Sequence, residues 1–207
     1  DLKLFQLSHY KETLVNIRDY SLKYKSAENP VFENLTFSVK KGDRIALSGK
    51  NGCGKSTLIK MLLSKNGLNN IDDIVSEQGE CEIASGLVIS YVGQDATWLK
   101  GDITGYCKEH NLDKSLFCAI LRQLDFERVQ FMKNIEEYSE GQKKKILLAT
   151  SLLTPAHLYI WDEPLNYIDV FSRMQIENLI LEISPTMLLV EHDKTFIEKI
   201  GTSVKKM

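Results

Sequence analysis

The stretch of sequence that most constrains the fold is Gly49-Lys50-Asn51-Gly52-Cys53-Gly54-Lys55-Ser56-Thr57. It matches G-x-x-x-x-G-K-[ST], the phosphate-binding P-loop, in which glycines let backbone N–H groups point inward at an anion. Lys55 directs a positive charge to the β- and γ-phosphates, and Ser56 offers a hydroxyl to Mg²⁺. The helix after the loop points its positive end at the same oxygens. With an apolar strand at Arg44–Ser48 before the loop, the pattern predicts an α/β fold that binds a nucleotide through Asn51, Gly52, Cys53, Gly54, Lys55, Ser56 and Thr57.

Length and composition leave room for one α/β domain with a small subdomain, since the chain has 207 residues. Hydrophobic residues are 43% and charged residues 26%, as in an ordinary soluble globular chain. A net charge of −2 gives no global electrostatic case for nucleic-acid binding. No apolar run approaches the roughly 18 residues of a membrane span, and no signal-peptide pattern opens the sequence.

The cysteines predict a reducing environment. They are scattered without metal-ligand spacing, and one of them lies inside the P-loop, so we interpret all four as free thiols in the cytoplasm: Cys53, Cys81, Cys107 and Cys118. The chain begins at Asp1 and stops soon after its last predicted strand. We therefore expect a domain of a longer protein.

The amino-terminal part is predicted to form an antiparallel sheet that leads into a parallel one. Residues 1–13 are polar and unpatterned, typical of a linker tail ahead of a folded domain over 14–207. β-type residues then run from Leu14 to Tyr24, and Leu35, Phe37 and Val39 alternate strictly before a turn. Tyr24, at the end of its strand, is either core filler or a stacking platform for a nucleotide base.

The next segment contains turn-forming residues and short strands. Residues 66–80 are rich in Asn, Asp and Gly, which predicts a surface loop. Glu80–Ala84 and Leu87–Tyr91 resemble the two strands of a hairpin around Ser85-Gly86. Gln94 follows the second strand, and a Gln in that place indicates little by itself.

Residues 96–137 lack strand signals. Asp113 can cap a helix with one apolar face, and aromatic residues surround it. We therefore expect a mainly helical subdomain over about 96–154, inserted in the α/β core. Ser139 and Gln142 have capping-box spacing, so a further helix is predicted to begin there and to stop at Thr154-Pro155. With Gly141 at its start, this helix is either plainly capped or forms a second anion site.

Two buried strands deliver polar residues at their carboxyl ends. Leu158–Trp161 leads into Asp162 and Glu163, and ligands of open α/β sheets bind at such strand ends. Adjacent strand residues point to opposite faces, so the two carboxylates should differ in role, one facing a metal and one the reacting water. Asp169 can cap the helix that follows. His192 follows the strand at Thr186–Val190 and lies at the same predicted edge.

The ordered set of motifs resembles an ATP-binding cassette (ABC) ATPase domain over nearly all of the chain after Thr13. The set is an aromatic at Tyr24, the P-loop, Gln94, a signature segment at Tyr138–Gln142, a Walker B strand ending at Asp162, then Glu163, Asp169 and His192. The resemblance implies ATP and Mg²⁺ as cofactors and adenine stacking by Tyr24. It further implies Mg²⁺ ligation by Ser56, Gln94 and Asp162, and catalysis by Glu163, His192 and Gln94. Ser139, Gly141 and Gln142 would clamp the γ-phosphate held by a second cassette.

One residue departs from the family pattern. Glu140 stands where the signature usually has Gly, and a negative side chain near a triphosphate is unfavourable unless it turns away. The strength of the clamp therefore depends on where Glu140 points.

Finer motifs resemble the ABC-F group. The segments at 139–145 and 161–169 are similar to those of ABC-F proteins that protect the ribosome from antibiotics, which carry two cassettes and no transmembrane domain. The resemblance implies a cytoplasmic protein, the ribosome and its RNA as partners, and this chain as the second cassette. The alternative is the ATP-binding subunit of a membrane transporter. A nucleotide-binding scaffold without turnover is disfavoured because Lys55, Asp162, Glu163 and His192 are all present.

Overall fold

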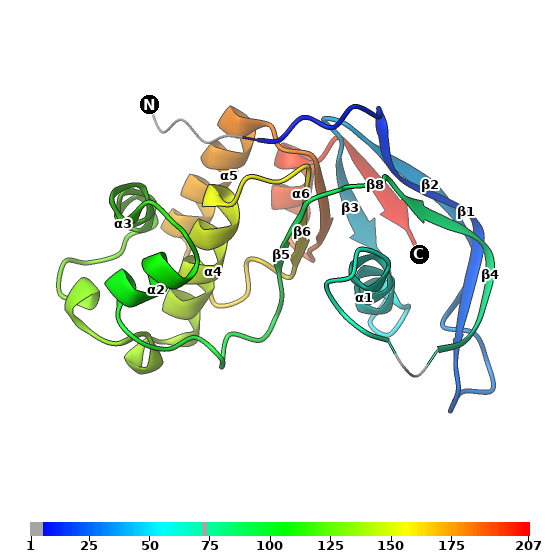
Figure 1. Cartoon of the computed structure of the whole chain (residues 1–207), viewed down its shortest axis with the longest axis horizontal. Coiled ribbons are helices and arrows are strands. Elements are labelled where there is room, and N and C mark those ends of the chain that lie inside the picture. The colour runs from blue at the N-terminus through cyan, green and yellow to red at the C-terminus, as the bar shows by residue number, and fades with distance from the viewer. Residues whose placement is uncertain (1–5, 72–73) are drawn as a thin grey trace.

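The computed structural model describes residues 6–71 and 74–207, and two β-sheets organise them (Figure 1). The first sheet is antiparallel, with strand order β2-β1-β4. Its strands are β1 (Thr13–Tyr24), β2 (Phe32–Lys40) and β4 (Ile74–Ile83). The predicted antiparallel section is confirmed.

The second sheet leads into the P-loop and into the residues that are predicted to take part in catalysis. Its order is β5-β6-β7-β3-β8, and all of its neighbouring strands are parallel. The strands are β3 (Arg44–Ser48), β5 (Ile89–Val92), β6 (Leu158–Asp162), β7 (Met187–Val190) and β8 (Ser203–Lys206). Because they are parallel, their carboxyl ends meet at one edge, and the predicted α/β fold is confirmed.

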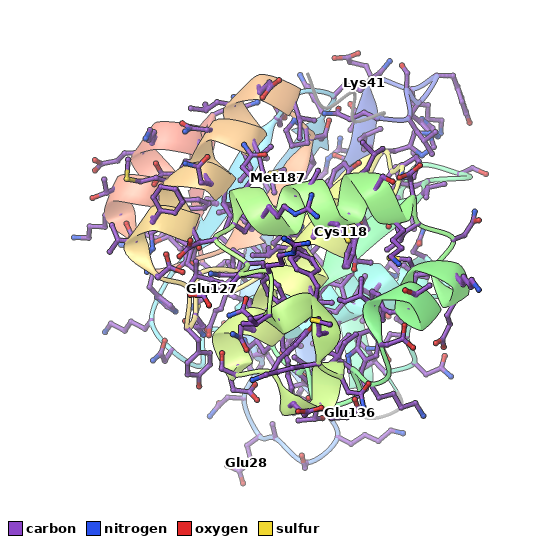
Figure 2. All side chains as sticks on the ribbon, turned by 90° about the vertical axis from the view of Figure 1, so that its left-hand side faces the viewer. Glu28, Lys41, Cys118, Glu127, Glu136 and Met187 are labelled. Atoms are coloured by element: carbon purple, nitrogen blue, oxygen red, sulfur yellow. The ribbon has the colours of Figure 1, made fainter. Side chains whose placement is uncertain are left out.

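Helices cover both faces of this parallel sheet. The helix α1 (Lys55–Lys65) lies on the side of the antiparallel sheet, and α4 (Glu140–Leu153), α5 (Val170–Ile183) and α6 (Lys194–Ile200) lie on the other side (Figure 1). The range 96–154, all of it described, contains helices, turns and loops without a strand, namely α2 (Ile103–Glu109), α3 (Lys114–Gln123), η1 (Gln130–Met132), η2 (Ile135–Glu137) and α4. Figure 2 views the molecule from this helical side, with Cys118 of α3 labelled.

Local capping explains where these helices begin. The Asp113 carboxylate accepts a hydrogen bond from the Leu116 N–H at 2.9 Å, and Asp169 accepts one from the Ser172 N–H at 2.8 Å. Such caps satisfy backbone donors that have no partner within the first helical turn. Both helix starts agree with the prediction from sequence.

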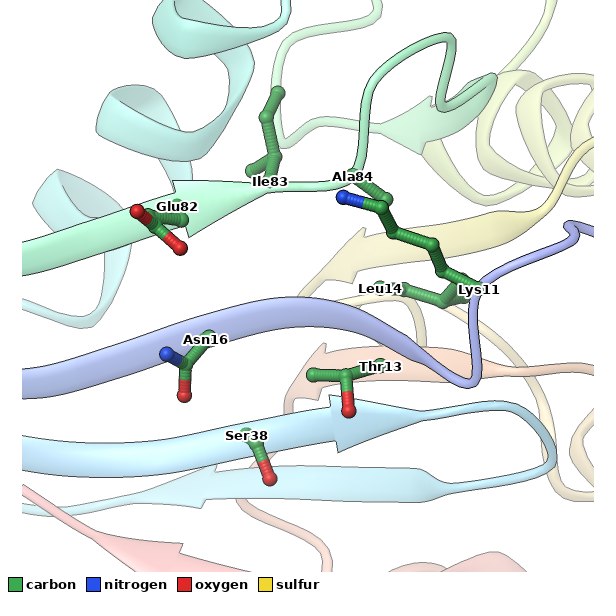
Figure 3. A pocket seen from close by; sticks show the side chains of 8 residues that line it. All are labelled: Lys11, Thr13, Leu14, Asn16, Ser38, Glu82, Ile83 and Ala84. Carbon is green, nitrogen blue, oxygen red and sulfur yellow. The ribbon is translucent and has the colours of Figure 1, made fainter.

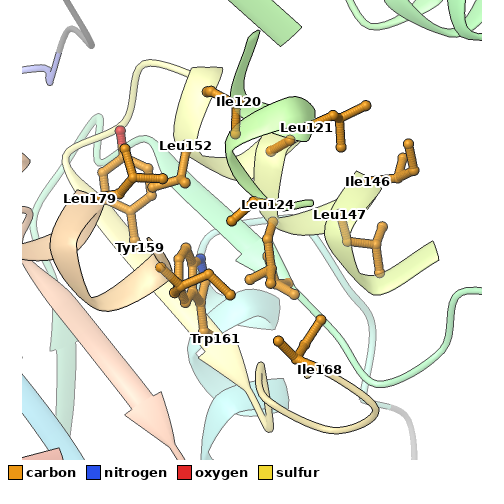
Figure 4. Close-up of a cluster of buried hydrophobic side chains, with 14 of the residues drawn as sticks. Ile120, Leu121, Leu124, Ile146, Leu147, Leu152, Tyr159, Trp161, Ile168 and Leu179 are labelled. Atoms are coloured by element: carbon orange, nitrogen blue, oxygen red, sulfur yellow. The ribbon is translucent and has the colours of Figure 1, made fainter. Parts of the chain in front are cut away.

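Two apolar clusters lie on opposite faces of the parallel sheet. The strand β6 divides its side chains between them, because successive strand residues point to opposite sides. Tyr159 and Trp161 belong to the cluster formed with the helical subdomain, which Figure 4 shows, and Leu158 and Ile160 belong to the cluster around α1 and the antiparallel sheet. This strand is buried along its whole length.

The predicted hairpin around Ser85-Gly86 is wrong. The strand β4 pairs antiparallel with β1, and β5 pairs parallel with β6, so the two strands belong to different sheets. The predicted loop over 66–80 is also too long, since β4 already begins at Ile74; residues 72–73 lie outside the described residues. In both cases the strand pairs with a strand that is distant in the sequence, and local sequence patterns do not reveal such a partner.

The segment before β1 makes specific contacts with the body of the protein. The Leu7 N–H donates to the Ala156 carbonyl at 3.1 Å, and the ring of His9, 5% exposed, lies within 3.0 Å of the Ser85 carbonyl oxygen. The division into a tail over 1–13 and a domain over 14–207 stays a prediction. Across residues 6–71 and 74–207, no helix is long and apolar enough to cross a membrane.

Candidate nucleotide-binding site

The P-loop joins β3 to α1 and depends on glycine at one crowded position. Gly54 has φ +97°, and a Cβ built there would lie 2.7 Å from side-chain carbons of both Val31 and Phe32. A left-handed backbone and a lack of space therefore both require glycine here. The loop ends directly at the start of α1, whose first N–H groups have no partner within the helix and can receive an anion.

Lys55 lies inside the curl of this loop. Its side chain is buried, and its Nζ donates hydrogen bonds to the carbonyl oxygens of Gly49 at 2.9 Å and Lys50 at 3.0 Å. These bonds hold the loop in a closed curve around the ammonium group. The positive charge is thus already positioned where a phosphate chain would enter.

A pocket of about 540 Å³ opens beside the loop. Tyr24, Asn51, Ser56, Thr57 and Glu163 line it together with Lys55. The Tyr24 hydroxyl donates to Thr57 Oγ1 at 2.8 Å, which holds this aromatic side chain against the first turn of α1. The volume suits a small organic ligand such as a nucleotide. Base stacking by Tyr24 stays a prediction.

A second hollow, of about 350 Å³, lies over the antiparallel sheet between β1, β2 and β4 (Figure 3). Its polar lining includes Lys11, Asn16, Ser38 and Glu82. None of the residues predicted to act on a nucleotide lines it, so the P-loop pocket is the better candidate for the site.

Asp162 lies at the carboxyl end of β6 and suits a cation ligand. Its side chain is 4% exposed, and burial raises its pKa, whereas hydrogen bonding from Gln94 and Ser56 and the charge of Lys144 oppose that rise. Its Oδ1 is buried and, among the described residues, has no hydrogen-bond partner. A carboxylate with a free oxygen beside a hydroxyl and an amide offers the hard oxygen ligands that Mg²⁺ prefers. The residues therefore fit a bound Mg²⁺, which would stabilise charge on the phosphates.

Glu163 follows Asp162 and lines the P-loop pocket. Its φ is +51°, a left-handed conformation that ends the extended course of the strand. Its Oε2 accepts a hydrogen bond from Asn166 Nδ2 at 2.7 Å, and its Oε1 lies 3.6 Å from His192 Nε2. The side chains of Glu163 and His192 therefore face each other, and their roles in catalysis stay predictions.

Sequence reasoning gave no role to Glu191. This carboxylate is 7% exposed and accepts backbone hydrogen bonds from His192 at 2.7 Å, Asp193 at 3.3 Å and Leu165 at 3.2 Å. It thereby joins the loop that carries His192 to the loop that follows Glu163. The available signal was an acidic residue directly after an apolar strand, but only the fold reveals its partners.

The signature segment lies at the start of α4, outside the P-loop pocket. Ser139 and Gln142 form the predicted capping box, with the Gln142 N–H 3.3 Å from Ser139 Oγ and the Ser139 N–H 2.9 Å from Gln142 Oε1. A Cβ at Gly141 would lie 2.4 Å from the Tyr167 carbonyl oxygen, so the loop after β6 closely covers this position. Glu140 directs its carboxylate to Lys143 at 3.5 Å, along its own helix.

Comparison with known proteins identifies the family. The sequence model of a family described as ABC transporter matches residues 32–166, more than half of the chain. This chain belongs to the ABC transporter family. It is an ABC ATP-binding cassette, and the α/β architecture with a P-loop is the fold expected of that family.

Relatives of the cassette include two curated bacterial proteins. The chain is 34% identical over 176 residues to the ATP-binding protein Uup of Buchnera aphidicola subsp. Acyrthosiphon pisum, and 30% identical over 182 residues to the ribosome protection protein VmlR of Bacillus subtilis. These matches cover 81% and 85% of this chain but 28% and 31% of the relatives, so the chain spans about a third of their length.

A solved structure resembles the cassette over almost its whole length. It is described as the ATP-binding subunit of an ABC transporter and aligns with a TM-score of 0.73 at 25% identity. The alignment covers 94% of this chain and 86% of that one. The cassette therefore shares its fold with that ATP-binding subunit.

Replacing Lys55 with Ala is expected to weaken ATP–Mg²⁺ binding to the cassette by roughly 10- to 100-fold, about the value of one charge-assisted hydrogen bond of 1.5–3 kcal/mol. The substitution also removes the two bonds that hold the loop curved. Isothermal calorimetry measures the change. Lys60→Ala, on the exposed face of α1, is the matched control. Equal affinities for parent and Lys55→Ala would contradict the assignment.

Proposed function

We propose that this chain is an ATP-binding and hydrolysing cassette of a soluble, cytoplasmic ABC-F protein that acts on the ribosome and protects it from antibiotics. The observation that carries the proposal is the similarity to VmlR, a ribosome protection protein, over 85% of the chain. The amino-acid sequences of the signature segment and of residues 161–169 also resemble those of ABC-F proteins. Because this chain spans 31% of that relative, the activity of the whole protein is part of the proposal.

We further propose that the active unit contains two cassettes, of which this chain is the second. Lys55, Ser56 and Glu163 line one pocket, whereas Ser139 and Gly141 lie outside it. A signature segment that lies outside the P-loop pocket of its own cassette can contact a nucleotide if it faces the P-loop of a partner cassette. Head-to-tail pairing would then complete each site with the signature residues of the other cassette.

The ATP-binding subunit of a membrane transporter is the second candidate. The solved ATP-binding subunit of an ABC transporter favours this candidate, because the alignment with this chain covers 86% of that subunit's chain. A single cassette of about this size can therefore act as such a subunit. The P-loop chemistry is common to both candidates. They differ in the partner, which is the ribosome in one case and a membrane component in the other.

The test is co-sedimentation with ribosomes of the protein that carries this chain, with Glu163→Gln and the equivalent change in the other cassette. Because the variant keeps its ATP-binding residues but loses its base, we expect the cassettes to stay closed around ATP. The protein should pellet with ribosomes through a sucrose cushion when ATP is present. Equal recovery with and without ATP, or no recovery in either case, would remove the ribosomal proposal.

A further inference from the structure

Three consecutive lysines at the start of α4 have three different partners. Lys143 lies 3.5 Å from Glu140 on the same helix, and Lys145 pairs with Asp169 at 2.8 Å. Lys144 donates from Nζ to the carbonyl oxygen of Gly93 at 3.0 Å. Lys144 is also the most buried of the three, with 3% exposure. An ammonium group is rarely buried to this extent without a function or a charged partner.

The surroundings of Lys144 are strongly acidic. Burial lowers its pKa, and the carboxylates of Asp162, Glu163, Glu191 and Glu140 act in the opposite direction and favour the charged form. Lys144 in turn helps to keep Asp162 ionised. The ammonium group thus neutralises part of the negative charge at the edge of the sheet where Mg²⁺ would bind.

The hydrogen bond of Lys144 ends on a residue next to a predicted ligand. Gly93 directly precedes Gln94, which is predicted to bind Mg²⁺ and the attacking water. On the helix side, Lys144 lies three residues after Gly141, which is about one turn of α4. The Lys144 side chain therefore links the loop that carries Gln94 to α4, one turn beyond Gly141.

We propose that Lys144 is a positioning residue that couples the metal end of the nucleotide site to the signature helix of the same cassette. The proposal rests on the ATPase function proposed above. A movement of the Gln94 loop would be transmitted through the Lys144–Gly93 bond to α4, and Ser139 and Gly141 at the start of that helix would shift with it. We further expect the positive charge of Lys144 to oppose the binding of Mg²⁺ at this end of the site, because two cations repel each other.

The charge and the hydrogen bond of Lys144 predict separate effects. Lys144→Met removes both, Lys144→Gln removes the charge but keeps an N–H donor, and Lys144→Arg keeps both. Without the charge, Mg²⁺ should bind more readily, and its half-saturating concentration for nucleotide binding should fall on the order of tenfold. Without the hydrogen bond, kcat should fall about tenfold or more. A residue that only stabilised the fold would not improve Mg²⁺ binding.

The experiment titrates MgCl₂ into the whole protein in the presence of a fluorescent ATP analogue, and it measures kcat and KM for ATP hydrolysis. Amide hydrogen exchange is followed separately at residues 93–95 and 139–143 without nucleotide. We expect Lys144→Met to show tighter Mg²⁺ binding, lower kcat and faster exchange in both segments. Lys144→Gln should share the Mg²⁺ effect with most of kcat retained, and Lys144→Arg should resemble the parent. Lys143→Met is the control, with unchanged Mg²⁺ binding.

Two outcomes would overturn the inference. One is a higher Mg²⁺ requirement in both Lys144→Met and Lys144→Gln, and the other is no change of Mg²⁺ midpoint or exchange in either. Failure of the parent protein to bind ATP–Mg²⁺ at all would instead overturn the proposed function. If Lys144→Met does not fold, Lys144→Gln still tests the effect of the charge.

Discussion

Glu163→Gln is expected to reduce ATP hydrolysis by a factor on the order of 10²–10⁴, the range for loss of a general acid–base group. The amide keeps the size and the hydrogen-bonding reach of the carboxylate but cannot take a proton from water. Binding of ATP should persist, because Lys55, Ser56 and the loop amides are untouched. In the structure, Glu163 lines the pocket and faces His192 at 3.6 Å, where an attacking water would be held.

Single-turnover hydrolysis and nucleotide binding, measured on the same preparation, separate the two effects. Glu182→Gln changes an exposed carboxylate on α5 and serves as the control for loss of negative charge. A Glu163→Gln protein that hydrolyses ATP at the parental rate would exclude Glu163 as the base. Loss of binding together with hydrolysis would indicate a structural role for Glu163 instead.

Trp161→Ala is expected to lower the free energy of unfolding by about 3–5 kcal/mol, the range for truncating a large buried aromatic residue. The Trp161 side chain has 0% exposure and fills the cluster between β6 and the helical subdomain (Figure 4). Its Nε1 donates to Ser151 Oγ at 2.9 Å, and that oxygen lies 2.7 Å from Ser90 Oγ. Truncation therefore leaves a cavity and removes one partner of a buried hydroxyl pair.

Chemical denaturation followed by circular dichroism measures this loss. The chain offers a matched control in Trp98, which is 51% exposed, and Trp98→Ala should cost no more than about 1 kcal/mol. Similar losses for the two variants would mean that the cluster around Trp161 does not carry the expected share of stability.

The sequence predicted those parts of the fold that depend on local chemistry. Caps at Asp113, Ser139 and Asp169 use side-chain and backbone groups within three residues, and the P-loop helix begins directly after Gly54. The strand partners of β4 and β5 lie tens of residues away in the chain, so a turn signal at Ser85-Gly86 indicated a hairpin where the chain passes from one sheet to the other. The strand β8, at Ser203–Lys206, was not predicted because its polar pattern resembles a surface loop.

In the candidate site, too, local motifs revealed some residues, whereas others depend on contacts with distant segments. Motif spacing located Lys55, Asp162 and Glu163, whose neighbours in the chain define their chemistry. Glu191 and Lys144 gain their roles from backbone groups of distant loops, which no local pattern encodes. The individual ligand and catalytic roles of the site residues stay predictions until they are measured.

The division of β6 between two apolar clusters has a consequence for how such a cassette diversifies. The P-loop helix packs within one cluster and the signature helix within the other, and the parallel sheet separates them. Substitutions in distant, separate clusters affect stability nearly additively. The helical half can therefore accumulate changes that suit a new partner while the half that holds phosphate keeps its packing. The loops at the carboxyl edge, which Glu191 and Lys144 join through bonds to Leu165 and Gly93, are the part whose residues have to change together.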